Sequence, residues 1–244
     1  MVLTEEQFKE IKDYTLSCYP NEMCGIITEN IFVPIDNVHE NPEDNFTLNP
    51  VQIAPFFGKI DAIIHSHTRA IDKTEILDLR TPSYADVLGQ KKTNIPWLIV
   101  GTEGVTVTPP LTIPRIKNNN YIERPFIWFM NDCYSLVQDY YWFELGIDLP
   151  DHKADKDFTT IRRRDGLFDN YIQEYGFEEY NPLTVEFLKG DIFLLDNGGA
   201  IRNHLGIYTG DGYVLHQDML SRREPVENFA YKIHKVLRYV NKSL

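Results

Sequence analysis

The chain has 244 residues, enough for one large domain or for two of about 120 residues each. Hydrophobic residues make up 43% and aromatic residues 13%, which excludes a largely disordered chain. The formal net charge of −12 argues against direct binding to nucleic acid or to an anionic surface, because the long-range field repels such partners. An anionic target would have to be reached through a local site or a tethering partner.

The first residues are acidic and lead directly into a predicted helix, so we expect no secretory signal peptide. The longest apolar runs are too short to span a bilayer, which predicts no membrane insertion. Three cysteines, Cys18, Cys24 and Cys133, are too few for a disulfide framework. We therefore expect a protein that is made and folds in a reducing compartment.

A first helix is predicted to begin at the capping box of Thr4 and Gln7 and to end near Tyr19. Thr81 as cap and Pro82 in the first turn indicate the start of a later helix. Short apolar runs predict strands at residues 24–28, 31–35, 61–67 and 96–100. The mixture is typical of an α+β or α/β domain.

A metal site is indicated by His65 and His67, which lie two residues apart on one strand and therefore project from the same face. Ser83 and Asp86 are three residues apart at a helix start and share a helix face. Two histidines and one aspartate leave one position of a zinc ion open for water, as in a hydrolytic site. Glu22, just before the first predicted strand, is the candidate general base. Paired histidines also occur on polar surfaces, and it is the whole set that favours a site.

This set resembles the motif of the JAMM (Mov34/MPN) metalloproteases, including the context Asn21-Glu22-x-Cys24-Gly25. The resemblance implies a zinc ion with these residues around it: His65, His67 and Asp86 as ligands, Glu22 as general base, and Ser83 stabilising the oxyanion. Two features depart from the family pattern. Thr68 stands where a proline is usual, and the spacer from Thr68 to Ser83 is long.

The stretch from Thr108 to Asn120 contains three prolines and three consecutive asparagines, a composition typical of an exposed connector. We predict a domain boundary here, although a loop within one domain is the alternative. The predicted division is residues 1–110, a linker over 111–120, and a second domain over 121–244.

Cys133 follows Asn131 and Asp132, either of which can cap a helix that begins at the cysteine. The positive end of that helix is expected to lower the thiol pKa and favour the nucleophilic thiolate. A lone cysteine is more often a small buried residue, so the catalytic interpretation depends on finding a histidine. Helices are predicted within residues 161–164 and 167–175. After them, strands are predicted at 192–195, 203–208 and 212–217.

The last two strands form a predicted hairpin around Thr209-Gly210-Asp211-Gly212. One register pairs His204 with His216 and the next pairs it with Gln217, and both leave a polar group to orient the His204 imidazole. A nucleophile, a base and an orienting group are the components of a catalytic triad. Both histidines could instead be ordinary residues of a solvated strand face.

The second half resembles the NlpC/P60 cysteine peptidases, papain-like α+β enzymes that cut cell-wall peptides. The resemblance rests on Asp132-Cys133-x-Ser135-Leu136-Val137, Gly190-Asp191-Ile192, Asn203-His204-x-Gly206-Ile207-Tyr208 and His216. It implies Cys133 as nucleophile, His204 as base and His216 as orienting residue. The oxyanion role that a tyrosine often takes in the family is unassigned: Phe126 and Trp128 are the nearest aromatic residues, with Tyr121 farther back.

A JAMM-like half followed by an NlpC/P60-like half resembles the tail-tip assembly proteins of long-tailed phages, of the lambda protein K type. The resemblance implies a two-domain α+β protein made in the host cytoplasm and acting at the host cell envelope from the virion tail tip. Its implied partners are other tail-tip or baseplate proteins, and its implied substrates are peptidoglycan stem peptides cut next to diaminopimelate. The zinc domain would act in tail assembly.

The alternative is a mainly structural tail-tip protein in which one or both sites are catalytically silent. A bacterial wall-remodelling enzyme is a third hypothesis, which the expected lack of a signal sequence disfavours.

Overall fold

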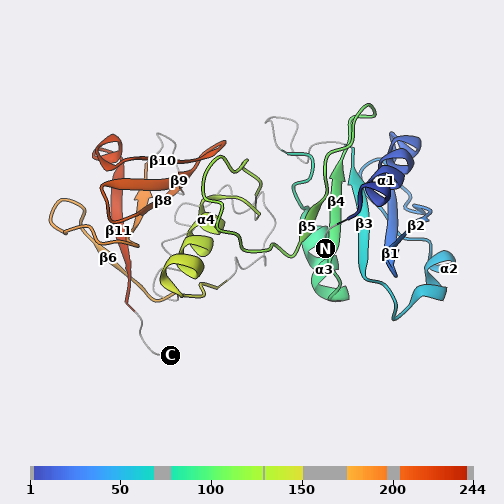
Figure 1. The fold of residues 1–244 in the computed structure, drawn as a ribbon, viewed down its shortest axis with the longest axis horizontal. Coiled ribbons are helices and arrows are strands. Elements are labelled where there is room, and N and C mark those ends of the chain that lie inside the picture. Colours follow the sequence, from blue (N-terminus) through green and yellow to red (C-terminus); the bar gives the residue numbers. More distant parts are fainter. Residues whose placement is uncertain (1–2, 69–77, 129, 151–174, 197–203, 241–244) are drawn as a thin grey trace. The chain divides into compact units, whose positions relative to one another are not determined.

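The computed structural model describes residues 3–68, 78–128, 130–150, 175–196 and 204–240 (Figure 1). The chain divides into two compact units, Met1–Ile116 and Lys117–Leu244. Helices and sheets occur in both, so the expected α+β class is confirmed. The helices predicted within residues 161–164 and 167–175 lie almost wholly outside the described residues.

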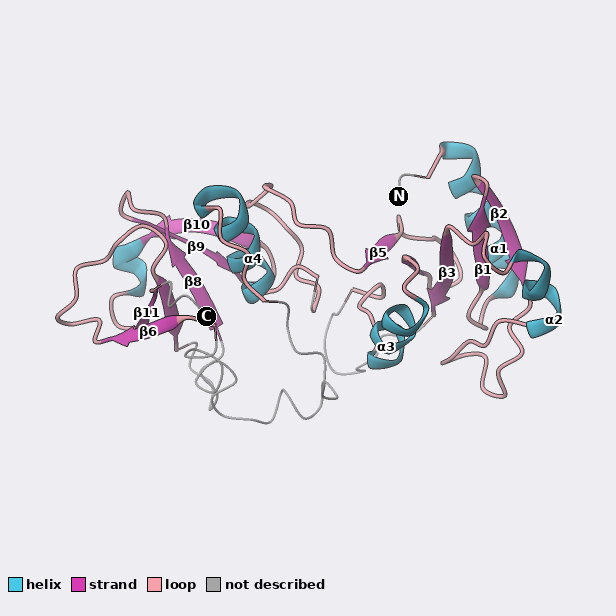
Figure 2. Ribbon diagram, turned by 90° about the horizontal axis from the view of Figure 1, so that it is seen from below, coloured by secondary structure: helices cyan, strands magenta, loops and turns pink. Residues whose placement is uncertain are grey.

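The first unit is built on a five-stranded sheet of order β2-β1-β3-β4-β5, with strands drawn as arrows in Figure 2. The pair β3–β4 is parallel and the other pairs are antiparallel. The elements are α1 (Glu5–Cys18), β1 (Cys24–Thr28), β2 (Ile31–Ile35), α2 (Pro50–Ile53), η1 (Ala54–Phe56), β3 (Ala62–His67), α3 (Tyr84–Thr93), β4 (Trp97–Gly101) and β5 (Leu111–Ile113). All four strands predicted for this half are present.

The predicted capping box of α1 is confirmed. The Thr4 hydroxyl accepts a hydrogen bond from the Gln7 amide at 3.1 Å, and the Gln7 side chain accepts one from the Thr4 amide at 2.7 Å. The buried Ile11 of α1 packs with Met23, Ile27 and other apolar residues of the sheet.

The start of α3 differs from the prediction, which placed the cap at Thr81. Ser83 is the N-cap: its hydroxyl accepts from the Asp86 amide at 3.1 Å, and the Asp86 carboxylate accepts from the Ser83 amide at 2.7 Å. This reciprocal pair satisfies two amide groups of the first turn, which Thr81 cannot do. The helix therefore begins beyond Pro82, and Thr81 is buried.

Leu111–Ile113, at the start of the predicted linker, forms the edge strand β5. Its residues pair with β4, for example Thr112 opposite Leu98. The prolines before and after it lack amide donors, which keeps this strand short and at the sheet edge.

Within the described residues, the second unit contains the short α-helix α4 beside a six-stranded sheet of order β10-β9-β8-β7-β11-β6. Every neighbouring pair in this sheet is antiparallel. The elements are α4 (Cys133–Tyr140), the π-helical turn η2 (Tyr141–Leu145), β6 (Phe177–Tyr180), β7 (Ile192–Leu195), β8 (His204–Tyr208), β9 (Tyr213–Gln217), β10 (Ser221–Pro225), η3 (Val226–Phe229) and β11 (Ile233–Tyr239). The three strands predicted for this half are confirmed, with β8 described from His204 onward.

The two faces of this sheet have different apolar partners. On one face Leu205, Ile207 and Leu215 pack with α4, which lies beside β8 and β9 in Figures 1 and 2. On the other face Val214 packs with Phe229 of η3 and with neighbouring apolar residues. Since side chains alternate along a strand, each residue of β8 and β9 belongs to one face or the other.

The hairpin between β8 and β9 has a register that neither predicted alternative gives. His216 pairs with Gly206. His204 is two residues before Gly206 on the same strand, so it lies diagonally across from His216 instead of directly opposite it. The turn is longer than assumed: Gly210 and Gly212 both have positive φ, and the Thr209 amide donates to the Tyr213 carbonyl. Side chains on a diagonal still share a face, so the two histidines remain neighbours.

Candidate functional site

The residues predicted as metal ligands in the first unit come together. Nε2 of His65 lies 3.1 Å from Nε2 of His67 and 3.1 Å from one carboxylate oxygen of Asp86. The other Asp86 oxygen lies 3.2 Å from Nε2 of His67. A tetrahedral zinc ion with ligand distances of about 2.0–2.1 Å needs ligand atoms about 3.3 Å apart. The three side chains therefore lie close enough together to hold one metal ion.

The two imidazoles are held in different ways. Nδ1 of His67 donates to the Leu79 carbonyl at 2.8 Å, which directs the other ring nitrogen, Nε2, into the cluster. Nδ1 of His65 is buried and has no hydrogen-bond partner among the described residues. Its ring instead stacks on Phe46 at 4.3 Å and meets the Trp97 ring edge-on at 5.7 Å.

The carboxylate and the two imidazoles of the cluster shift one another's pKa values. Burial alone would raise the pKa of Asp86, but the two histidines hold it well below its usual range. Burial also acts to lower the pKa of His67, yet the hydrogen bond and charge of Asp86 outweigh it and the pKa is raised. The pKa of His65 is lowered, because its complete burial dominates. One carboxylate thus lies between two imidazoles of unequal basicity.

Glu22, the predicted base, is 6% exposed. Burial raises its pKa to about 8, with His67 acting in the opposite sense and Asp86 and Asp44 adding to the rise. A carboxyl group with that pKa can exchange a proton near neutral pH. Ser83 uses its hydroxyl oxygen as the helix cap, which leaves the hydroxyl proton as a donor.

Sequence reasoning missed a loop that closes over this cluster. Asn37 organises it: its amide group donates to the carbonyls of Glu22 and Asn45, both at 3.0 Å, and its oxygen accepts from the Thr47 amide. The Glu22 amide donates to the Pro42 carbonyl at 2.7 Å. The same loop carries Phe46, and no spacing or motif in the sequence marks either residue.

In the second unit Cys133 is the first residue of α4, as predicted. Asp132, rather than Asn131, is the N-cap: its carboxylate accepts from the Ser135 amide at 2.8 Å. The Ser135 hydroxyl donates to the Asp132 carbonyl at 2.8 Å. These two bonds fix the turn that presents the thiol.

The Cys133 sulfur accepts a hydrogen bond from the backbone amide of Leu205, so the thiol lies against the start of β8, one residue from His204. Burial, followed by the negative charge of Asp132, raises the thiol pKa to about 12. The expectation of a lowered pKa is wrong for this conformation, because burial outweighs the hydrogen bonds at the helix start.

His204 and His216 are in contact, with Nε2 of His204 3.3 Å from Nδ1 of His216. Burial and the neighbouring His216 lower the pKa of His204 to about 4, so the imidazole is neutral at pH 7. Gln217 points to the opposite sheet face, and its amide donates to the Arg124 carbonyl at 2.8 Å. The residue beside His204 is therefore His216 and not Gln217.

A buried ion pair lies behind the Cys133 turn and was not predicted. Arg124 donates to Asp139 of α4 at 2.8 Å and to the Asn131 side chain at 2.9 Å. Arg124 and Asp139 are 15 residues apart in sequence, on a loop and a helix, so no periodic pattern links them.

The aromatic residues considered for the oxyanion role differ in position. The Tyr121 hydroxyl donates to Glu144 at 3.3 Å. Glu144 lies eleven residues after Cys133 on the continuous helix of α4 and η2, about 16 Å along its axis. Tyr121 is therefore bound at the far end of the helix from the thiol. Phe126 and Trp128 pack edge-on at 5.0 Å.

These features define a two-unit α+β protein whose residues 123–237 match the sequence model of the NlpC/P60 family. The matched residues lie within the second unit. The chain is 29% identical to tail tip assembly protein K of Escherichia phage N15, over 91% of this chain and 89% of that protein. It is 28% identical to tail tip assembly protein K of Escherichia phage lambda, over 75% of this chain and 83% of that protein. The expected resemblance to the lambda protein K type is confirmed.

Among solved structures, the solution structure of a Desulfitobacterium hafniense protein matches 45% of this chain and 79% of its own, at 19% identity and a TM-score of 0.27. That likeness is too low to support an argument. Among the described residues, no helix is long and apolar enough to cross a membrane.

Proposed function

We propose that the second unit is a cysteine peptidase that hydrolyses amide bonds in peptidoglycan stem peptides. The observation that carries the proposal is the NlpC/P60 match over residues 123–237, within which Cys133 begins a capped helix against the start of β8. The His204–His216 pair on the adjoining strands supports it. The cell-wall substrate follows from the family resemblance and the similarity to phage tail-tip proteins.

In this reaction the Cys133 thiol attacks the substrate carbonyl while its proton passes to His204. Because the thiol pKa is about 12 and that of His204 about 4, both groups are neutral at rest, and the proton moves only when a substrate is attacked. The proton then goes to the departing amine, and water hydrolyses the thioester. Amide groups at the start of α4 are suited to stabilise the oxyanion.

The test is incubation of the full chain with purified muropeptides, followed by mass spectrometry of the products. We expect cleavage by the wild type and by Cys18→Ala, which removes a thiol of the first unit, and none by Cys133→Ala. Cleavage by Cys133→Ala would overturn the proposal.

We further propose that the first unit is a zinc metallopeptidase that acts during tail assembly, with His65, His67 and Asp86 as ligands. The mutual distances of 3.1–3.2 Å support a tetrahedral ion. When bound, zinc would supply Lewis-acid activation of water for amide hydrolysis. Glu22 takes up and returns the proton, and the Ser83 hydroxyl donates to the developing oxyanion.

Metal analysis of purified protein tests this site. We expect zinc in the wild type and in His39→Gln, which changes a histidine of the same unit outside the cluster, and its loss in the His65→Ala/His67→Ala double variant. Equal zinc content in all three proteins would refute the assignment.

The names of the two relatives favour a role at the phage tail tip, and we propose that this chain joins other tail proteins there. It would be assembled in the host cytoplasm and carried to the envelope in the virion, which suits a chain of net charge −12. A purely structural role is the second candidate, because both relatives are named as assembly proteins. Phage carrying Cys133→Ala decides between them: normal tails with poor infection support the enzyme, and normal infection supports the structural role.

A further inference from the structure

The feature that the proposed mechanism leaves unused is the second ring nitrogen of His216. This residue of β9 is 5% exposed, and its Nδ1 lies 3.3 Å from Nε2 of His204. Its Nε2 is buried and has no hydrogen-bond partner among the described residues. A buried ring nitrogen without a partner is costly, so its surroundings matter.

A carboxylate lies close to that nitrogen. Glu224 of β10 places an oxygen 3.8 Å from Nε2 of His216, longer than a hydrogen bond but within ion-pair range. In the β9–β10 register Arg222 is opposite His216 and Glu224 opposite Val214, so all four share one sheet face. Phe229 of η3 closes the site, with its ring 5.1 Å from the His216 ring.

Other charged groups around His216 do not replace Glu224. Asp218 follows on the same chain segment, and Arg222 and Lys232 are cations that oppose protonation of the ring. The Arg222 guanidinium lies 3.9 Å from the other Glu224 oxygen and 3.5 Å from Asp218. Among the described residues, Glu224 is the carboxylate with an ion-pair contact to the ring.

We propose that Glu224 is a positioning residue of the cysteine site, which holds the proton of His216 on Nε2. A proton there leaves Nδ1 of His216 as an acceptor, so that Nε2–H of His204 donates to it. Nδ1 of His204 is then the unprotonated nitrogen that receives the proton of Cys133. A small rotation of the half-buried Glu224 side chain brings its oxygen within hydrogen-bond distance of His216.

The protons balance along this chain of groups. Transfer of one proton from the Cys133 sulfur to His204 gives a thiolate and an imidazolium, and His216 keeps its own proton throughout. The negative charge of Glu224 stabilises the imidazolium through His216, and the return of the proton to the leaving amine restores the neutral pair. The inference rests on the proposed role of Cys133 and assigns the orientation of its base to a fourth residue.

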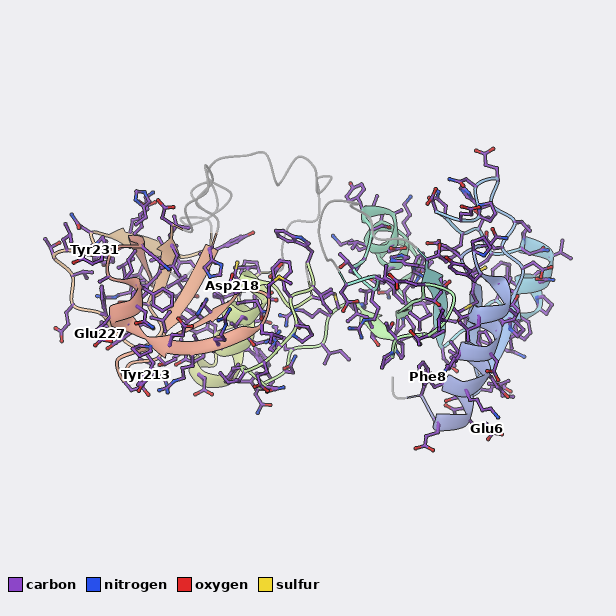
Figure 3. All side chains as sticks on the ribbon, turned by 90° about the horizontal axis from the view of Figure 1, so that it is seen from above. Glu6, Phe8, Tyr213, Asp218, Glu227 and Tyr231 are labelled. Carbon is purple, nitrogen blue, oxygen red and sulfur yellow. The ribbon has the colours of Figure 1, made fainter. Side chains whose placement is uncertain are left out.

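The experiment compares the full-length wild type with Glu224→Met and Glu224→Gln. The matched control is Glu227→Gln, which removes one charge from the same unit. Glu227 is an exposed residue of η3 and is labelled in Figure 3. Nitrogen-15 NMR of labelled histidine side chains reads the tautomer directly, with His216 assigned from a His216→Gln spectrum. Muropeptide cleavage gives kcat and KM, and thermal unfolding verifies that each variant is folded.

We expect His216 to be protonated on Nε2 in the wild type and in Glu227→Gln, and this signal to shift in Glu224→Met. In Glu224→Met, kcat falls about 10–100-fold, by analogy with partners that orient metal-bound histidines, while KM changes by less than about twofold. Glu224→Gln keeps an acceptor oxygen but no charge, so its kcat lies between those of Glu224→Met and the wild type.

A wild-type His216 protonated on Nδ1 would overturn the proposal, as would a folded Glu224→Met protein with the wild-type histidine spectrum and kcat. Failure of the cysteine mechanism itself gives a different result, namely cleavage that survives Cys133→Ala. The NMR measurement needs no turnover and therefore tests Glu224 independently.

Discussion

Replacing Arg124 by Met is expected to destabilise the second unit strongly. The Arg124 and Asp139 side chains are 4% and 0% exposed and lie 2.8 Å apart. Removing one partner of a buried ion pair leaves the other charge buried without its counter-ion, which costs about 3–5 kcal/mol. For a unit the size of residues 117–244, each kcal/mol corresponds to about 4 °C, so Tm should fall by about 12–20 °C.

The assay is calorimetry of the full chain, with hydrogen exchange of β8 and β9 peptides to assign the transition. Arg223→Met is the matched control: Arg223 pairs with Asp211 at the surface, where an ion pair contributes little to stability. The double variant Arg124→Met/Asp139→Leu should recover at least half of the loss, because an apolar pair leaves no buried charge. A fall of less than about 4 °C in Arg124→Met, or no recovery in the double variant, would refute the reasoning.

Three further outcomes are expected. Iodoacetamide labelling of Cys133, followed by peptide mass spectrometry, should speed up about tenfold per pH unit from pH 7 to 10, because the thiol pKa is about 12; a plateau near pH 8 would contradict this. The folded-state pKa of His204 is about 4 and its ordinary value 6.5, so only the unfolded state takes up this proton as pH falls between those values, and stability is lost there. Urea unfolding at pH 7.0, 5.5 and 4.5 should show a weaker acid dependence in His204→Asn than in the wild type, and parallel curves would disprove the assignment. Phe46→Leu should weaken zinc binding about tenfold in chelator competition, since the ring stacks on His65, while Phe57→Leu, at an exposed ring, should bind like the wild type; equal affinities would remove Phe46 from the site.

The cluster of His65, His67 and Asp86 could be predicted from the sequence, because the local geometry of a strand and of a helix start places these side chains. A strand places His65 and His67 on one face, and a helix start places Asp86 at a fixed offset from Ser83. The cap itself was placed two residues too early, since Thr81 and Ser83 are both good caps and only the reciprocal bonds with Asp86 distinguish them. Phe46 reaches His65 through an irregular loop, which no periodicity describes.

In the second unit the positions of Cys133 and His204 followed from strand and helix signals, but their ionisation did not. The helix start argues for a low thiol pKa, while burial, a property of the folded chain, reverses the direction. The hairpin register also escaped prediction, because a turn with two glycines at positive φ can take one more residue without a change in its composition. Glu224 could be found only from the pairing of β10 with β9.

The backbone that carries His65 is paired on both sides, with Cys24 of β1 and with Ile99 of β4. An interior strand of this kind opens to solvent only when the whole sheet unfolds, so His65 stays in place as long as the first unit is folded. Cys133, in contrast, is the first residue of α4, where fraying requires little free energy. On heating, the helix start at Cys133 should therefore loosen below the melting temperature of its unit, whereas His65 should become exposed only when the first unit melts.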